Sequence, residues 1–186
     1  MPLLALEPFI HPEQLLGAPP AGGRWWVLHT RPRAEKTLAR RCLDRGAAYF
    51  LPLYRRQWVS GGRQFRSFLP LFPGYLFLYG DDRDRLTALE TNLVAQVLPV
   101  RDQERLHADL GRVHRLITGE AAVTPEDGLA PGDSVEIVAG PFTGLTGKLV
   151  RRGGEVRFVV EVEFLRRAVS MEVEGWMIRP GGPAAE

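Results

Sequence analysis

A sharp bend followed by an apolar strand, in residues 70–79, constrains this chain most. Pro73 fixes its own φ angle and Gly74 tolerates a positive φ, so the chain can reverse direction just before Tyr75. Side chains then alternate between the two faces of the strand. One face carries Tyr75, Phe77 and Tyr79, and the other carries Leu76 and Leu78. Both faces are apolar, which predicts a central strand covered on both sides or a strand at a protein interface.

The composition is that of an ordinary globular protein. The 186 residues, 45% of them hydrophobic, suffice for one domain or two small ones, and no apolar run approaches the ~20 residues of a membrane span. The first 23 residues do not resemble a secretory signal. Cys42 is the only cysteine, which excludes an intramolecular disulfide and favours a cytoplasmic location. One cysteine and four scattered histidines predict no metal site, and no cofactor is expected.

Basic residues are concentrated in one part of the chain. Between Arg24 and Arg66 there are eleven basic and two acidic residues, although the whole chain carries a net charge of only +2. A local field of this size favours a polyanionic partner, and nucleic acid is the first candidate. Nearly all of these cations are arginine, which suits phosphate recognition but also fits a high-GC coding bias.

The first half of the chain alternates between strand and helix signals. Residues 1–23 are rich in Pro, Gly and Ala without a period, which predicts a disordered tail. Besides residues 75–79, strands are predicted at 24–29, 48–52 and 94–100, with a hairpin over 54–69 that turns at Gly61 and Gly62. Helices are predicted over residues 30–46, with Pro32 in the first turn, over 84–89, and from Gln103 to about residue 118. This order predicts an α+β domain in which helices flank a mainly antiparallel sheet.

The pattern changes in the second half. Residues 119–129 break all periodicity and are predicted to form a linker. Short strands are predicted at 134–138, 148–151, 156–164 and within 169–178, and side chains alternate most strictly over 156–164. Such closely spaced strands predict a small all-β barrel of the SH3-like kind. The predicted division is a tail (1–23), an α+β domain (24–118), a linker (119–129), a β-barrel domain (130–180) and a tail (181–186).

Two sets of motifs together resemble the NusG family of bacterial transcription elongation factors. In the first half the matching segments are WWVLHT (25–30), AEK (34–36) and LFPGYLF (71–77). In the second half PGDSV (131–135), GPF (140–142) and GKLV (147–150) resemble the KOW motif of the family. The resemblance spans residues 24–180 and implies a NusG N-terminal domain followed by a KOW barrel.

The resemblance implies a monomeric factor without catalytic activity or a membrane partner. In the family, the N-terminal domain binds the clamp helices of RNA polymerase through a hydrophobic depression and suppresses pausing. By position, that depression would be lined by His29, Phe72, Tyr75 and Phe77. The residues near the non-template DNA strand would be Arg31, Arg33, Lys36 and Arg40.

The resemblance also implies a second partner for the KOW domain, either ribosomal protein S-ten or the termination factor Rho. The contacting residues would be Phe142, Phe164 and Leu165, although Phe142 could equally fold back as a plug of the barrel.

Several positions depart from the general factor of the family. Residues 30–33 (TRPR) replace a glycine-containing turn, and Leu93 stands where glycine is usual. In the partner loop, Leu165 and Arg166 replace Phe and Gly. The hairpin turn and residues 69–72 are more similar to the specialised RfaH-like antiterminators, which leaves coupling to Rho or the ribosome open. The second domain of RfaH can be a helical hairpin, but the strict alternation over residues 156–164 predicts strands here.

Two functions of other classes compete with this interpretation. GYLF (74–77) superficially resembles the aromatic strand of an RNA-recognition motif, which suggests a free-standing RNA-binding module. That motif's leading basic residue and its second small residue are absent here, where Leu76 takes the place of the small one. An enzyme is disfavoured because the sequence contains no nucleophile–base motif, phosphate-binding glycine loop with lysine, or metal cluster.

Overall fold

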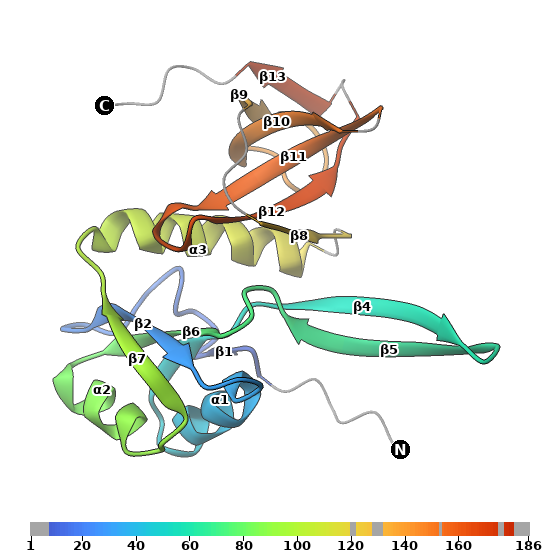
Figure 1. Cartoon of the computed structure of the whole chain (residues 1–186). Coiled ribbons are helices and arrows are strands. Elements are labelled where there is room, and N and C mark those ends of the chain that lie inside the picture. The colour runs from blue at the N-terminus through green and yellow to red at the C-terminus, as the bar shows by residue number, and fades with distance from the viewer. Residues whose placement is uncertain (1–7, 120–121, 128–131, 153, 175–176, 181–186) are drawn as a thin grey trace. The chain divides into compact units, whose positions relative to one another are not determined.

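The computed structural model divides the chain into two compact units, Met1–Gln103 and Glu104–Glu186. It describes residues 8–119, 122–127, 132–152, 154–174 and 177–180 (Figure 1). The predicted fold class is confirmed, because unit 1 combines helices with antiparallel strands and unit 2 is rich in antiparallel β-structure. The remaining residues, which include parts of the predicted tails and linker, lie outside the described ones.

Unit 1 is built on a five-stranded antiparallel sheet with the strand order β1-β3-β6-β2-β7. Its strands are β1 (Ile10–His11), β2 (Arg24–Thr30), β3 (Ala48–Phe50), β6 (Tyr75–Gly80) and β7 (Val94–Pro99). The strand after the Pro-Gly bend, β6, pairs with β3 on one side and with β2 on the other. The prediction that this strand is central in its sheet is therefore confirmed.

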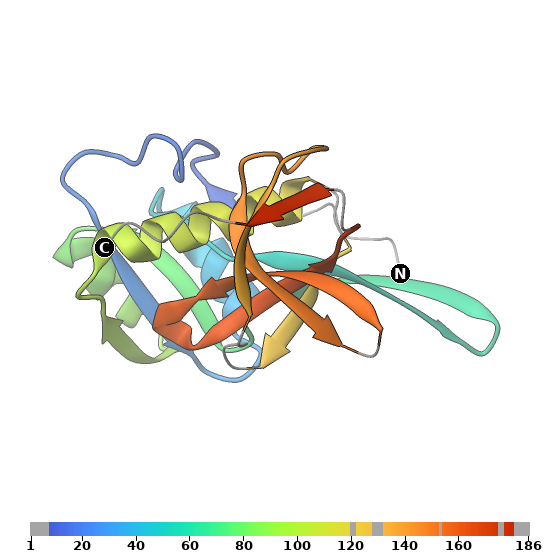
Figure 2. The ribbon, with the colours of Figure 1, turned by 90° about the horizontal axis from the view of Figure 1, so that it is seen from above.

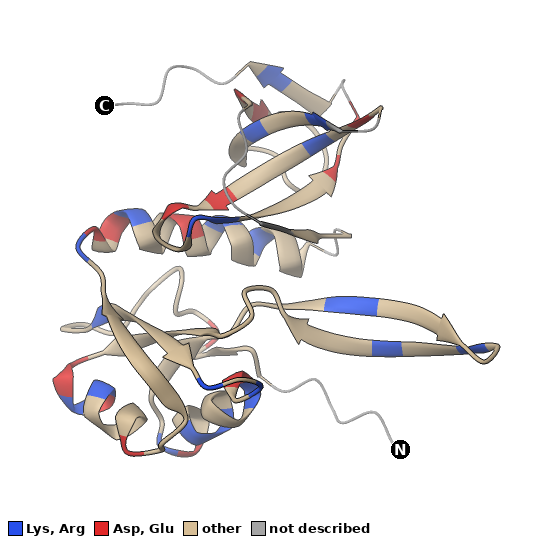
Figure 3. Ribbon diagram, in the orientation of Figure 1, with Lys and Arg blue, Asp and Glu red and all other residues tan. Residues whose placement is uncertain are grey.

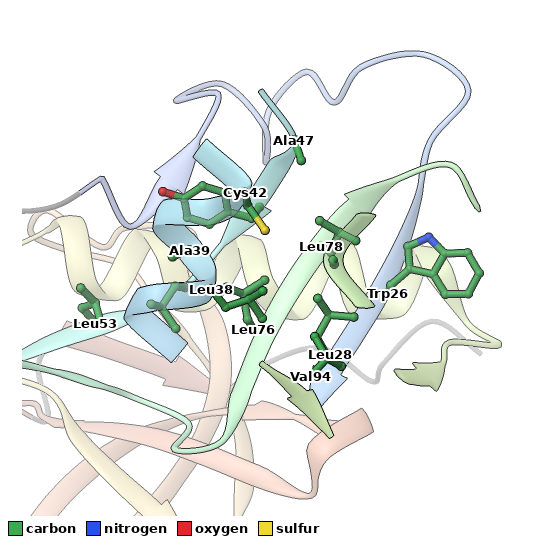
Figure 4. Packing of buried hydrophobic residues seen from close by; sticks show 13 residues of the cluster. Trp26, Leu28, Leu38, Ala39, Cys42, Ala47, Leu53, Leu76, Leu78 and Val94 are labelled. Atoms are coloured by element: carbon green, nitrogen blue, oxygen red, sulfur yellow. The ribbon is translucent and has the colours of Figure 1, made fainter. Parts of the chain in front are cut away.

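One face of this sheet packs against two helices, α1 (Glu35–Asp44) and α2 (Asp82–Leu89) (Figure 4). Leucines of β6 and β2 meet Leu38, Ala39 and Cys42 of α1 and Ala88 of α2 in a buried cluster. A capping box formed by Asp81 and Asp84 begins α2, which satisfies backbone N–H groups that the helix itself leaves unpaired.

Helix α1 begins later than the sequence predicts. Arg33 adopts a left-handed backbone with φ of 61°, which interrupts the helical geometry, so that Pro32 precedes the helix instead of lying in its first turn. The predicted stop is in place, since Gly46 follows the helix with a positive φ of 69°.

The opposite face of the sheet carries aromatic and aliphatic side chains that are equally buried. Trp25, Val27, Phe50 and Phe77 are each at most 2% exposed. Edge-to-face contact joins Trp25 to Tyr79, with ring centroids 5.1 Å apart. Both faces of β6 are thus covered, as the apolar pattern on its two sides predicts.

The predicted disordered tail is wrong for the described residues before β2. Ile10 pairs with Phe50 at the edge of the sheet, and the backbone N–H of Leu51 donates to the carbonyl of Phe9 at 2.6 Å. Leu15 is fully buried. A few apolar side chains at irregular spacing hold this segment, and they are too few to produce a period in a Pro-rich sequence.

The predicted hairpin forms a two-stranded sheet of its own, β4 (Leu53–Ser60) with β5 (Arg63–Pro70). Gly61 and Gly62 both have positive φ angles, 54° and 73°, as a two-residue hairpin turn of type I′ requires. The hairpin projects beyond the five-stranded sheet of unit 1 in two perpendicular views (Figures 1 and 2).

Unit 2 contains a six-stranded antiparallel sheet with the order β13-β9-β10-β11-β12-β8. Its elements are β8 (Thr124–Asp127), β9 (Asp133–Ile137), β10 (Thr146–Arg152), β11 (Glu155–Val162), the 3-10 helix η1 (Glu163–Leu165), β12 (Arg167–Glu172) and β13 (Ile178–Pro180). Two predictions need correction. Part of the predicted linker is β8, which pairs with β12, and the predicted strand 156–164 ends at Val162, where the chain turns into η1.

Helix α3 (Gln103–Thr118) contributes all but its first residue to unit 2, although the sequence prediction placed it in the first domain. Asp109 is 1% exposed, and its carboxylate accepts a hydrogen bond from the backbone N–H of Glu163 at 3.0 Å. Arg105 forms an ion pair with the Glu163 carboxylate at 2.7 Å. These contacts fasten α3 to η1. No helix within the described residues is both long and apolar enough to cross a bilayer.

Candidate functional site

The bend before β6 is a β-turn held by two other elements. The N–H of Tyr75 donates to the carbonyl of Phe72 at 3.1 Å, and Gly74 has a φ of 85°, as the third position of a type II turn requires. The N–H of Gly74 donates to a carboxylate oxygen of Glu35, in the first turn of α1, at 2.7 Å. The carbonyl of Gly74 accepts from the N–H of Thr30, at the end of β2, at 2.8 Å. The turn is therefore fixed to both α1 and β2.

We expect Glu35→Ala to lower the free energy of unfolding by about 1 kcal/mol, because the Gly74 N–H loses its acceptor in a half-buried place. Glu35→Gln keeps an acceptor oxygen and is expected to cost less. Urea denaturation of the two variants checks this. Equal effects of the two substitutions would mean that the hydrogen bond to the turn is not what Glu35 contributes.

The turn places Tyr75 against His29 of β2. Their rings stack, with centroids 5.2 Å apart and planes inclined by 28°, and both side chains are half-buried. A Cβ atom at position 74 would lie 3.5 Å from the His29 ring, an ordinary van der Waals distance, so the positive φ and not the ring is what favours glycine at this turn. Two of the four residues predicted to line a polymerase-binding depression are thus a contacting pair that solvent partly reaches.

The other two predicted residues lie deeper. Phe72 is 3% exposed and Phe77 is fully buried, and their rings meet edge to face with centroids 6.2 Å apart. Phe77 also lies 6.4 Å from Phe50 of the neighbouring strand. The four predicted residues therefore form two ring pairs, an accessible one (His29 and Tyr75) and a buried one (Phe72 and Phe77). Tyr75 and Phe77 are alternate residues on the same face of β6, and we call the two pairs together the aromatic cluster.

The four cations predicted to lie near nucleic acid border the start of α1. Arg31, Arg33 and Arg40 are exposed, and Lys36 is half-buried. Lys36 and Arg40 are four residues apart in α1 and so share one side of the helix. Figure 3 shows this end of unit 1 with basic residues gathered along α1.

The predicted partner-binding residues of unit 2 differ in exposure. Phe142 is 7% exposed, and a side chain at Gly119 would collide with its ring, so the ring packs against the end of α3. The guanidinium of Arg115 donates to the carbonyl of Thr143 at 2.9 Å and fixes the same loop. Phe164 and Leu165, in η1, are half-buried.

The thiol of Cys42 is buried in unit 1 and is poorly suited to nucleophilic chemistry. Burial raises the pKa of the Cys42 thiol to about 12, so the nucleophilic thiolate is scarcely populated at neutral pH. Burial also lowers the pKa of His114. Within the described residues, no three His, Cys, Asp or Glu side chains gather as they would around a metal ion.

Three features of the structure were not predicted from the sequence as functional or anchoring positions. The anchoring role of Glu35 was not predicted, although the residue lies in the AEK motif. The second feature is Asp109, which lies three residues after Leu106 on the apolar side of α3. A carboxylate at an apolar position of a helix could have indicated in the sequence that this residue has a specific partner. The third is a pair of exposed aromatic residues on the hairpin, where the alternation of arginine and aromatic residues was visible in the sequence.

Comparison with protein families gives a match that covers most of unit 1 and continues through α3. Residues 23–119 match the family model described as "Transcription termination factor nusG", which is more than half of the chain. The chain belongs to the NusG family. The match includes the whole aromatic cluster, the bend and the cations along α1. Because NusG-family proteins are transcription factors and not enzymes, a role in transcription follows for this member.

A solved structure described as "Domain interaction in Thermotoga maritima NusG" is similar to this NusG-family chain. The two share 19% sequence identity at a TM-score of 0.46, and the similarity covers 85% of this chain and 97% of the other. A comparison with curated proteins gave no match.

Proposed function

We propose that this NusG-family protein is a transcription elongation and antitermination factor of the RfaH-like kind, acting in the cytoplasm. In this proposal unit 1 binds the clamp helices of RNA polymerase, and unit 2 acts as a KOW domain that engages a second protein. The observation that carries the proposal is the stacked His29–Tyr75 pair on its anchored turn.

The His29–Tyr75 pair has the properties of an interface anchor. The two rings present apolar area at little entropic cost, because the turn and the sheet behind them fix their backbone. The exposed Arg31 and Arg33 lie two and four residues after His29 in the chain and supply a basic rim. A central aromatic contact with a polar rim is the usual layout of a protein interface. The rim would also attract the non-template DNA strand.

In unit 2 the proposal assigns the partner contact first to Phe164 and Leu165. These residues are half-buried in η1, next to the exposed Arg166. Phe142 is packed against the end of α3 and would become available only if its loop left Arg115. Ribosomal protein S-ten and Rho are the two candidate partners.

Binding of purified RNA polymerase tests the proposed docking surface. We expect the double variant His29→Ala, Tyr75→Ala to bind polymerase at least about tenfold more weakly than the wild type, because both rings are lost from the anchor. Quantitative pull-down or biolayer interferometry measures the change.

Leu86→Ala is a matched control for this experiment. Leu86 is an apolar side chain, 51% exposed, on α2, so its loss should leave polymerase binding unchanged. A wild-type protein that does not bind polymerase would refute the proposal, as would a folded double variant that binds like the wild type.

The alternative, a free-standing RNA-binding module, predicts a different result for Tyr75. It requires that a base stack on this ring, whereas His29 already stacks against it. Loss of single-stranded RNA binding in Tyr75→Ala, with polymerase binding intact, would favour the alternative.

A further inference from the structure

The hairpin formed by β4 and β5 carries an exposed aromatic pair. Trp58 and Phe65 are directly opposite each other in the register of the two strands, and their rings stack with centroids 5.6 Å apart and planes inclined by 17°. They are 42% and 41% exposed. Two large rings facing solvent are unusual on a part of the chain that has no core of its own.

Exposed apolar side chains are concentrated on this hairpin. Among the described residues the large hydrophobic side chains that remain exposed are Trp58, Val59, Phe65, Leu86 and Val138, of which the first three lie near the hairpin tip. Such clustering marks an interaction site, whereas single exposed apolar residues are normal.

The charge of the hairpin is of one sign. Residues 53–70 contain four arginines and no acidic residue, and Figure 3 shows blue basic segments but no red acidic ones along both strands. The arginines are Arg55, Arg56, Arg63 and Arg66, and all four are exposed. Within the part of the chain that the structure describes, none of them forms an ion pair. Their charge is therefore available to an anionic partner.

The rings and two of the arginines share one face of the hairpin. Alternation along the paired strands places Arg56 and Arg63 on the same side as Trp58 and Phe65. A hollow of about 340 Å³ lies against this face and is lined by Arg56, Trp58, Ser67 and Leu69. Stacking surface and phosphate-binding groups thus lie side by side on a ribbon that projects from unit 1.

We propose that this face of the hairpin binds single-stranded nucleic acid, with unpaired bases stacking on Trp58 and Phe65 and phosphates contacting the arginines. Base stacking on aromatic side chains combined with a positively charged path for the backbone is the general mode of single-strand binding. The proposal goes beyond polymerase docking, because it concerns a separate surface and needs no other protein.

The exposed rings favour a single strand over a duplex. A base in a duplex has its faces covered by its neighbours and offers only its edges in the grooves, so it cannot stack on Trp58 or Phe65. Arginines alone would suit either form. The aromatic pair is therefore what selects unpaired bases, and DNA and RNA strands should bind alike, because stacking and phosphate contacts are common to both.

Fluorescence anisotropy with the purified full chain tests this inference. The probes are labelled oligo(dT) and oligo(U) of about 12 nucleotides, within the usual site size, and a DNA duplex of the same length. We expect the single strands to bind more tightly than the duplex. The double variant Trp58→Ala, Phe65→Ala should bind them about 10- to 100-fold more weakly.

Two further variants separate stacking from charge and from folding. Val59→Ala removes an apolar side chain that is even more exposed, at 68%, from the opposite face of the hairpin and should bind like the wild type. Arg56→Gln should reduce the slope of log K against log salt concentration by about 0.7, the value for one phosphate contact on a single strand. Circular dichroism spectra of all variants should match the wild type, since the substituted side chains are exposed.

Three results would overturn the inference. These are absence of single-strand binding by the wild type, unchanged affinity in the double aromatic variant, and a preference for the duplex. Because polymerase is absent from the assay, these results do not depend on the proposed docking of His29 and Tyr75.

Discussion

Replacing Phe77 by alanine should lower the free energy of unfolding by about 3–5 kcal/mol, the usual cost of truncating a buried aromatic ring. Phe77 is fully buried between Phe72 and Phe50, and the loss of its ring would leave a cavity on the aromatic face of the central strand. Chemical denaturation followed by circular dichroism measures the change.

Tyr75→Ala is the matched comparison for Phe77→Ala. Tyr75 lies two residues earlier on the same face of β6 but is half-buried, so its truncation should cost clearly less. Similar losses at the two positions would contradict the division of the cluster into buried support and accessible anchor. The same difference makes the His29–Tyr75 variant a better test of polymerase docking than any variant of Phe77.

Replacing Asp109 by alanine should cost about 1–3 kcal/mol of unfolding free energy. The substitution removes the acceptor of the Glu163 backbone N–H and the ion-pair partner of Arg105 and Arg112. Asp109→Asn retains an acceptor oxygen for Glu163 and should cost less. Thermal or chemical denaturation compares them, and a stability of Asp109→Ala equal to that of the wild type would show that these contacts do not hold α3 to η1.

Asp109 should also make stability depend on pH. Burial raises the pKa of its carboxyl above the ordinary 3.8, against the opposing effects of the Glu163 hydrogen bond and the Arg112 guanidinium. A raised pKa in the folded state means that the folded protein holds the proton more tightly than the unfolded chain. The resulting stabilisation is fully present below pH 3.8 and is lost as the pH rises through the folded pKa.

The non-titrating variant Asp109→Asn isolates this pH effect. The difference in unfolding free energy, wild type minus Asp109→Asn, should fall as the pH is raised from acid towards neutrality. A difference that grows over the same range would mean that the ion pairs with Arg105 and Arg112 outweigh the burial of the carboxylate.

Local sequence patterns predicted most of the helices and strands, because side-chain alternation and turn-forming residues act over only a few positions of the chain. The alternation around Phe77 identified a central strand, and Gly61 with Gly62 identified the hairpin turn. The segment containing Leu15 could not be found in this way, because its order depends on contacts with strands far along the chain. The end of β11 could not be found either, because apolar residues recur at every second position of the sequence up to Phe164, whereas the strand ends at Val162 and η1 follows.

The sequence predicted which residues belong to the candidate site, but not how deeply each of them is buried. Tyr75 and Phe77 occupy equivalent places in the alternating pattern, yet only Phe77 is fully buried. Burial depends on which neighbours cover each ring, and sequence spacing does not contain that information. Glu35 shows the same limit, since its carboxylate meets Gly74 across 39 positions of the chain.

The position of α3 has a consequence for how this protein can be divided into modules. The family match ends at residue 119, after the helix, whereas the compact units separate after Gln103, at its beginning. A fragment cut at the family boundary would keep Asp109 but lose the Glu163 N–H that its carboxylate binds. Grafting the C-terminal β-structure onto another factor should therefore succeed best when α3 is transferred with it.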